Sequence, residues 1–326
     1  MLVSEIPERI NLDSEYSFNV GLSNVRVSDD GVHVNDDVFP LEDSTVRSFG
    51  TLLDISQNYL KKCPPDLLAM NINHWLRERS ESEALVHVIS GQPRFLKSNI
   101  KMIPMKKVVE MIGRVFDPQD EVVELTTTDQ LTHVDVISNE HRIEVPGHDI
   151  PLRPEHDVTH GGIRFRIVTD FRARPPEVYT YLNRRVCTNG MCIADPQYKL
   201  TLQGRTVDEV LREMESTAQD LWGKLPETLE KFRSTADISV PGEVSHFIHA
   251  VAAEHGVGFR VTAEAINRVG ELPANPTLYD VINLLTSIAN EDVTYRTKES
   301  LQFLGGAMAS KPEAFSHRCS SCQHIL

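Results

Sequence analysis

The sequence lacks the marks of membrane and secreted proteins. Its longest apolar runs are far shorter than the roughly 20 residues that a membrane-spanning helix needs. The first ten residues, MLVSEIPERI, are acidic and have no apolar signal-peptide core. Five cysteines, an odd number in a chain of 326 residues, do not suggest a disulfide framework. These absences predict a protein of a reducing compartment, the cytoplasm, with no membrane association.

Common catalytic motifs are also missing. No P-loop, Gly-x-Gly-x-x-Gly, His-Glu-x-x-His or Gly-x-Ser-x-Gly pattern occurs. The usual nucleotide-binding and hydrolase functions therefore have no support, and we predict no catalytic residue.

Basic residues are scarce overall but concentrated locally. The net charge is −14, and residues 1–45 contain ten acids against two bases. Two basic islands, at residues 94–114 and 161–192, interrupt this pattern. Because local potential rather than net charge decides where a phosphate chain binds, both islands are candidate nucleic-acid surfaces.

Hydrophobic periodicity predicts an α+β fold, an antiparallel sheet with packed helices followed by a mostly helical C-terminal part. A hairpin is expected across Asp30-Gly31, and an apolar stripe at helical spacing follows Pro65. We divide the chain into an acidic N-terminal arm or hairpin (1–44), an α+β core with a basic hairpin (45–204), a helical region (205–312) and a Cys/His-bearing tail (313–326).

The basic hairpin is the most distinctive stretch. Two strand-like runs and the turn at Pro175-Pro176 between them contain six arginines, Arg164, Arg166, Arg172, Arg174, Arg184 and Arg185. Guanidinium groups suit phosphate because they are always charged and present a planar fork of donors. Tyr181 is a candidate for stacking on bases, and Lys106 and Lys107 extend the predicted surface. The alternative is that these arginines pair with the acids of the chain, including those of the N-terminal arm.

The phrase YLNRRVCTNGM, residues 181–191, resembles a hallmark of the phage- and plasmid-borne family catalogued as domain of unknown function 932. Further matches are Gly162-Ile163, the segment 98–115 and the late helix 277–289, so the resemblance spans about residues 45–305. It implies a protein of a mobile element such as a phage. A fainter likeness, to Rad52-like single-strand annealing proteins, implies homo-oligomeric rings or filaments.

Two segments contain candidate metal ligands. In the tail, a Cys-x-x-Cys pair with flanking histidines (His317, Cys319, Cys322, His324) is half of a structural zinc site, and a disordered tail is the competing interpretation. A loop rich in histidine offers His148, Asp149, His156, Asp157 and His160 to a divalent metal. Asn189-Gly190 favours a tight turn after Cys187, whose thiol we expect to be buried and inert.

Three hypotheses follow. The first is a phage-type protein that binds single-stranded DNA through the arginine hairpin and works in annealing or recombination. The second is an acidic interaction or structural protein that binds a host or phage protein, and it predicts a basic patch neutralised by the chain's own acids. The third is a metal-dependent enzyme built on the histidine loop.

Overall fold

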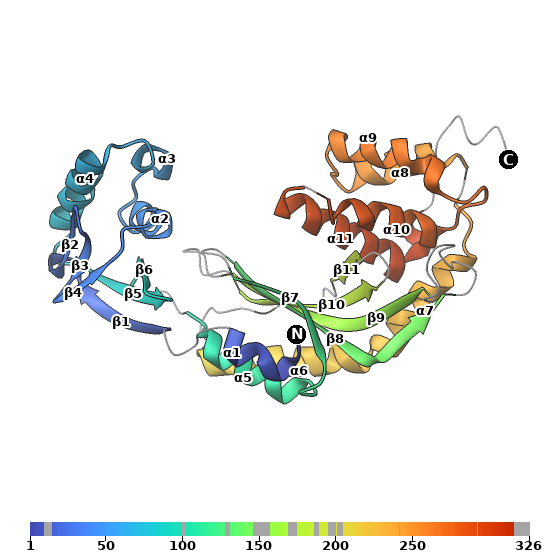
Figure 1. The fold of residues 1–326 in the computed structure, drawn as a ribbon, viewed down its shortest axis with the longest axis horizontal. Helices are drawn as coiled ribbons and strands as arrows, with labels where there is room; N and C mark the ends of the chain where they lie inside the picture. The colour runs from blue at the N-terminus through green and yellow to red at the C-terminus, as the bar shows by residue number, and fades with distance from the viewer. Residues whose placement is uncertain are drawn as a thin grey trace.

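The structure is a computed structural model. It describes residues 1–9, 15–99, 102–127, 131–145, 157–168, 175–185, 189–194, 200, 205–240, 242–291 and 293–315. Figure 1 shows an N-terminal lobe at one end, a curved sheet in the middle, and a group of helices above the sheet at the other end.

The N-terminal lobe consists of two small antiparallel sheets, ordered β1-β5-β6 and β2-β3-β4, and the helices beside them. Its elements are β1 (Tyr16–Gly21), η3 (Leu22–Asn24), β2 (Val25–Ser28), β3 (Gly31–Val34), β4 (Asp37–Phe39), α2 (Asp43–Leu52), α3 (Gln57–Leu60), α4 (Pro65–Glu78), β5 (Glu83–Ile89) and β6 (Gln92–Lys97). The rings of Phe49 and Phe95 stack in its core with centroids 4.3 Å apart. The predicted hairpin at Asp30-Gly31 is present as β2 and β3.

The middle of the molecule is an antiparallel sheet in the order β11-β10-β9-β8-β7, with α5 and α6 below it (Figure 1). Its elements are η1 (Val3–Glu5), α1 (Ile6–Arg9), α5 (Met105–Val115), β7 (Glu121–Thr127), β8 (Leu131–Glu144), β9 (Val158–Val168), β10 (Glu177–Arg184), β11 (Asn189–Ile193) and α6 (Val207–Gly223).

The C-terminal helices form a second core above and beside the sheet. They are α7 (Leu225–Ser234), α8 (Val244–Glu254), α9 (Phe259–Asn267), α10 (Leu278–Ile288) and α11 (Tyr295–Ser310). Capping boxes at Thr206 and Thr277 start α6 and α10, because each threonine and the acid three residues later satisfy backbone N–H groups that the helix leaves unpaired. Gly306 brings α11 against β11, since a Cβ there would collide with the carbonyl of Cys192.

The two faces of the large sheet differ in chemistry because apolar and polar residues alternate along its strands. One face presents Val134 of β8 and Phe165 of β9, which pack in one core with α5 and α6. The other face presents Asp135 and Arg164, which lie under α11, as a hydrogen bond from Arg164 to Gln302 shows. The charged face of the sheet is therefore inside the protein.

The described residues confirm the predicted α+β fold, with a helical C-terminal part. Within residues 1–44, Val3 and Ile6 pack in the core of the large sheet, whereas the buried apolar residues from Val20 to Phe39 pack in the core of the N-terminal lobe. Gly190 lies in strand β11 opposite Asn183 rather than in a tight turn. None of the helices in the described ranges combines the length and hydropathy that crossing a bilayer requires.

Candidate functional site

The centre of the charged face is a buried pair between Arg164 and Asp135. The guanidinium donates from Nε to Oδ1 at 2.6 Å and from Nη2 to Oδ2 at 2.5 Å, and its Nη1 donates to Gln302 Oε1 at 2.6 Å. Neither side chain of the pair is more than 2% exposed. The guanidinium also lies 4.8 Å from the centre of the Tyr181 ring, within range of a cation–π contact.

His133 lies beside this pair and faces two carboxylates. Its Nε2 is 3.4 Å from Glu124 Oε1 and 3.6 Å from Asp135 Oδ2. The imidazole is almost completely buried, yet among the described residues Nε2 has no hydrogen-bond partner. On the other side of the ring, Nδ1 lies 3.4 Å from the hydroxyl of Tyr295.

The same carboxylates control the protonation of this cluster. Burial alone would lower the pKa of His133, but Asp135 and Glu124 raise it above the ordinary histidine value. Burial alone would raise the pKa of Glu124, but His133 and Lys298, whose Nζ is 3.0 Å away, hold it well below its usual range. In the absence of a bound cation, the two carboxylates therefore favour the protonated form of His133.

Arg166 continues the charged face toward the solvent. Its guanidinium lies 2.5 Å from Glu177 Oε2 and 3.2 Å from Glu299 Oε1. Across the network, four carboxylates (Glu124, Asp135, Glu177, Glu299) meet three basic side chains (Arg164, Arg166, Lys298). With a neutral imidazole, these side chains leave one negative charge unbalanced.

A second buried pair lies at the other end of the sheet. Arg184 donates from Nε and Nη2 to the two oxygens of Asp157, both at 2.6 Å, and the hydroxyl of Tyr279 donates to the same carboxylate at 2.6 Å. Asp157 is thus fully engaged in the protein interior and does not present its carboxylate as a metal ligand.

Of the other predicted nucleic-acid contacts in the described chain, Arg185, Lys106 and Lys107 are exposed and Tyr181 is buried. Arg185 is exposed and pairs with both oxygens of Glu121. Lys107 pairs with Asp208 at 2.6 Å, whereas the exposed Lys106 is in no ion pair among the described residues. Tyr181 is only 3% exposed, so its ring cannot stack on a base. The structure thus brings Arg164 and Tyr181 together inside the protein and leaves Arg166 half-buried beside them.

Several predicted residues lie outside the described ranges. These are Arg172 and Arg174 of the hairpin, His148, Asp149 and His156 of the histidine loop, Cys187, and the tail residues His317, Cys319, Cys322 and His324. From the same loop, His160 is described. It is buried, its Nδ1 lies 2.8 Å from the carbonyl of Ser138, and burial lowers its pKa.

Cys192 packs under α11 and is fully buried. Burial raises the pKa of its thiol to about 12, so it stays protonated and unreactive at neutral pH.

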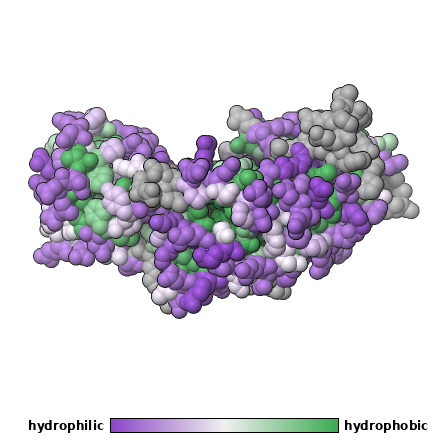
Figure 2. All heavy atoms as spheres, turned by 60° about the horizontal axis from the view of Figure 1, so that its bottom comes forward, coloured by the Kyte–Doolittle hydropathy of each residue, from purple (hydrophilic) through white to green (hydrophobic). Residues whose placement is uncertain are grey.

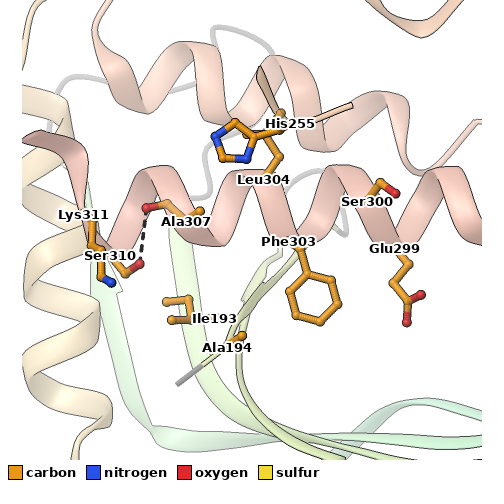
Figure 3. Close-up of a pocket in the computed structure, with 10 residues that line it drawn as sticks. All are labelled: Ile193, Ala194, His255, Glu299, Ser300, Phe303, Leu304, Ala307, Ser310 and Lys311. Carbon is orange, nitrogen blue, oxygen red and sulfur yellow. Dashed lines mark hydrogen bonds between the residues drawn. The ribbon is translucent and has the colours of Figure 1, made fainter. Parts of the chain in front are cut away.

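Between α11 and the end of β11 lies an open cavity of 450 Å³. Figure 3 shows Phe303 and Glu299 pointing from α11 toward the sheet and Lys311 at the opposite end of the helix. Glu299 already pairs with Arg166, and the Ser310 hydroxyl donates to the carbonyl of Ala307. The side chains of Glu299 and Ser310 in this cavity therefore already have partners within the protein.

A larger groove of 890 Å³ lies in the N-terminal lobe between α4 and the segment η3–β2. Its apolar lining comes from Leu22, Val25, Leu67, Met70 and Leu76, and its cationic lining from Arg26 and Arg77. No carboxylate lines it in the described part of the chain. Figure 2 shows hydrophobic surface on this lobe.

The apolar stripe predicted after Pro65 is present on α4, but only part of it is buried. Only Ile72 and Leu76 of α4 are fully buried, whereas Met70 is 67% and Leu67 41% exposed. The arginines of this groove differ from the buried arginines of the large sheet, which are held in ion pairs. Among the described residues neither Arg26 nor Arg77 is in an ion pair, and the Arg77 side chain donates from Nε to the carbonyl of Asn73.

Sequence reasoning missed the cluster of Glu124, His133 and Asp135. The alternation His-Val-Asp-Val at residues 133–136 was a usable signal, because it places His133 and Asp135 on one face of a strand. The approach of Glu124 depends on the pairing of β7 with β8 and had no local signal.

Comparisons with protein-family models, with curated proteins and with solved structures found no match. The resemblance to the family of domain of unknown function 932 therefore stays a prediction from the sequence.

Proposed function

We propose that this chain is an interaction protein that binds a partner protein through the groove beside α4. The observation that carries this proposal is a groove with an exposed methionine, Met70, and two arginines, Arg26 and Arg77, that no carboxylate of the described chain neutralises. Exposed apolar surface rimmed by polar groups is typical of protein-binding sites.

The chemistry of the lining defines the partner. Apolar side chains would fill the space between Leu67 and Met70, and acidic side chains would meet the guanidinium groups of Arg26 and Arg77. A segment of a host or phage protein with alternating apolar and acidic residues fits both requirements.

The charged face of the sheet supports this choice over general polyanion binding. Arg164 and Arg184 are buried and each is held by both oxygens of an aspartate. Breaking such a pair for a phosphate would leave a carboxylate buried without its partner, at a cost of several kcal/mol. The second sequence hypothesis predicted such neutralisation of the arginines by the chain's own acids.

An anionic, apolar dye tests the groove before any partner is known. Anilinonaphthalene sulfonate combines the two chemical features expected of the partner, so we expect saturable binding to the folded wild-type chain. Met70→Asp and Arg26→Glu should each weaken it several-fold. Val38→Asp is the matched control, because Val38 is also exposed, at 52%, but does not line the groove. Equal dye binding by Met70→Asp and Val38→Asp would contradict the proposal.

The same variants identify the partner. Cross-linking and mass spectrometry on host-cell extract should recover a protein with both wild type and Val38→Asp but not with Met70→Asp. Binding of a synthetic segment of that protein to the purified chain, again lost in Met70→Asp, completes the test. A protein that is recovered equally well with the Met70→Asp, Arg26→Glu and Val38→Asp variants would contradict a role for the groove.

Single-stranded nucleic acid is a second candidate ligand, favoured by the exposed cations of α5. Exposed ion pairs contribute at most about 1 kcal/mol, so phosphate can replace Asp208 at Lys107, and Lys106 is already without an ion pair among the described residues. This version of the annealing hypothesis relies on Lys106, Lys107 and Arg185 rather than on the buried arginines. Arg172 and Arg174 remain predicted contacts.

Fluorescence anisotropy with labelled single-stranded and duplex DNA across a salt series tests this candidate. If DNA binds along α5, Lys106→Glu with Lys107→Glu should reduce both the affinity and its salt dependence. Lys61→Glu with Lys62→Glu is the control, because it makes the same charge change at exposed lysines of the N-terminal lobe. The absence of single-strand binding at low salt would reject the candidate.

A further inference from the structure

We infer that Glu124, His133 and Asp135 form a binding site for a divalent first-row transition-metal cation, with Zn²⁺ as the best-fitting probe. One ligand atom from each residue lies within 4.8 Å of the other two. The site shares no residue with the N-terminal groove or with the Cys-x-x-Cys motif of the sequence. It does not rest on the proposed function.

The first argument is the position of His133 Nε2. This atom is buried, has no hydrogen-bond partner among the described residues, and points between two carboxylates. A buried nitrogen without a partner loses its interaction with water and gains nothing in return. A cation bound between the imidazole and the carboxylates would supply the missing interaction.

The second argument is distance. Nε2 lies 3.4 Å from Glu124 Oε1 and 3.6 Å from Asp135 Oδ2, beyond the usual range of about 2.7–3.2 Å for an N–H···O hydrogen bond. Two ligand atoms bound to tetrahedral zinc at about 2.0–2.1 Å lie about 3.4 Å apart. The separations thus match the edge of a zinc coordination sphere better than a direct hydrogen bond.

The surrounding side chains hold these ligands in place. The Tyr295 hydroxyl lies 3.4 Å from Nδ1, and Nε2 is the ring nitrogen that faces the carboxylates. Arg164 fixes Asp135 through two hydrogen bonds, and Lys298 bonds the second oxygen of Glu124. Such outer contacts orient metal ligands and are a regular feature of protein metal sites.

The cation also fits the accessibility of the site. Glu124 is 28% exposed, so a metal can arrive from the solvent on that side while Asp135 closes the interior. One imidazole and two carboxylates form a mixed N/O ligand set that suits zinc or manganese better than calcium. A fourth position remains for water or a substrate group.

The competing state is an imidazolium. A proton on His133 would balance the single excess negative charge of the network without any metal. Titration of the chain with metal distinguishes the two states. Only a metal site binds Zn²⁺ stoichiometrically and loses this binding when its ligands are substituted.

The experiment uses the full-length chain with Cys319→Ser and Cys322→Ser, so that the tail cannot contribute zinc. After treatment with a chelator, Zn²⁺ affinity is measured by competition with a chromophoric chelator, and Co²⁺ is added to record ligand-field absorption. We expect one Zn²⁺ per chain, a Co²⁺ spectrum of low coordination number, and a metal-dependent rise in Tm.

Glu124→Gln is the decisive variant because Glu124 is partly exposed and its loss leaves the buried pair of Arg164 and Asp135 intact. It should weaken Zn²⁺ binding at least about tenfold. Glu144→Gln, an exposed carboxylate on the same strand as His133, should leave binding unchanged. His133→Gln should abolish the Co²⁺ spectrum, and circular dichroism checks that it folds.

Two results would overturn the inference. One is the absence of saturable Zn²⁺ binding by the folded parent, which would assign the site to an imidazolium network. The other is equal affinity in Glu124→Gln and Glu144→Gln, which would place the bound metal elsewhere.

Discussion

Arg164 of β9 and Asp135 of β8 face each other in register across the sheet and share two hydrogen bonds, at 2.6 and 2.5 Å, in the protein interior. This relationship removes the first arginine of the basic hairpin from the surface. It also fixes the aspartate beside His133, so the same contact organises the candidate metal site.

Breaking this pair should destabilise the protein strongly. Arg164→Ala leaves the Asp135 carboxylate buried without its partner, and we expect a loss of about 3–5 kcal/mol in the free energy of unfolding, measured by urea denaturation. Arg185→Ala should cost less than about 1 kcal/mol, because the Arg185–Glu121 pair is exposed. Similar losses in the two variants would contradict the buried role of Arg164.

The contact of α11 with β11 depends on a glycine. Gly306→Ala would push a methyl group into the carbonyl of Cys192, so we expect a lower Tm and weaker packing of α11. Gly223→Ala at the end of α6 is the control, because a Cβ there meets nothing within 4 Å and should be neutral or slightly stabilising. The close packing would be refuted if both variants unfolded at the same temperature.

Acid should destabilise the N-terminal lobe through His87. Burial and then the nearby Arg94 lower the pKa of His87 to about 4, whereas the unfolded chain has the ordinary value near 6.5. The unfolded state therefore binds more protons between these values. The contribution of neutral His87, at most about 3 kcal/mol, is present above pH 6.5 and is lost as the pH falls toward 4.

Fluorescence can follow this loss in the lobe itself. The chain has two tryptophans, so Trp222→Phe leaves Trp75 of α4 as the reporter. Urea unfolding at pH 7 and pH 4.5 should show a large decrease in stability, and the decrease should be smaller when His87→Gln is added. An unchanged pH dependence in that variant would exclude His87 as the cause.

The two sides of α4 should respond differently to truncation. Ile72→Ala removes a fully buried side chain and should cost about 2–5 kcal/mol, because it leaves a cavity in the core of the lobe. Met70→Ala should change stability by less than about 0.5 kcal/mol while weakening binding in the groove. A stability loss for Met70→Ala as large as that for Ile72→Ala would show that Met70 belongs to the core.

Much of the local structure could be predicted because its causes are local. The Asp30-Gly31 turn, the capping threonines and the alternation along residues 163–167 act over a few residues. Arg164 and Arg166 share a face of β9 through the same alternation, as their register against β8 shows.

The neighbours of that face could not be predicted in the same way. A polar strand face can be covered by water or by a helix with polar side chains, such as α11. The local sequence pattern is the same in both cases. The helix predicted after Pro65 is present as α4, but helical spacing identifies apolar positions and not how much of the helix another element covers.

The amino-acid sequence by itself determined the elements, the α+β class and which side chains share a face, since periods of 2 and 3.6 residues act within each segment. Only the tertiary structure decided that Asp135, Arg164 and Gln302, up to 167 positions apart, meet in one buried network. Such contacts depend on strand register and on helix packing over long stretches of chain. The same long-range packing turned a predicted phosphate-binding surface into an internal charge network and placed His133 between two carboxylates.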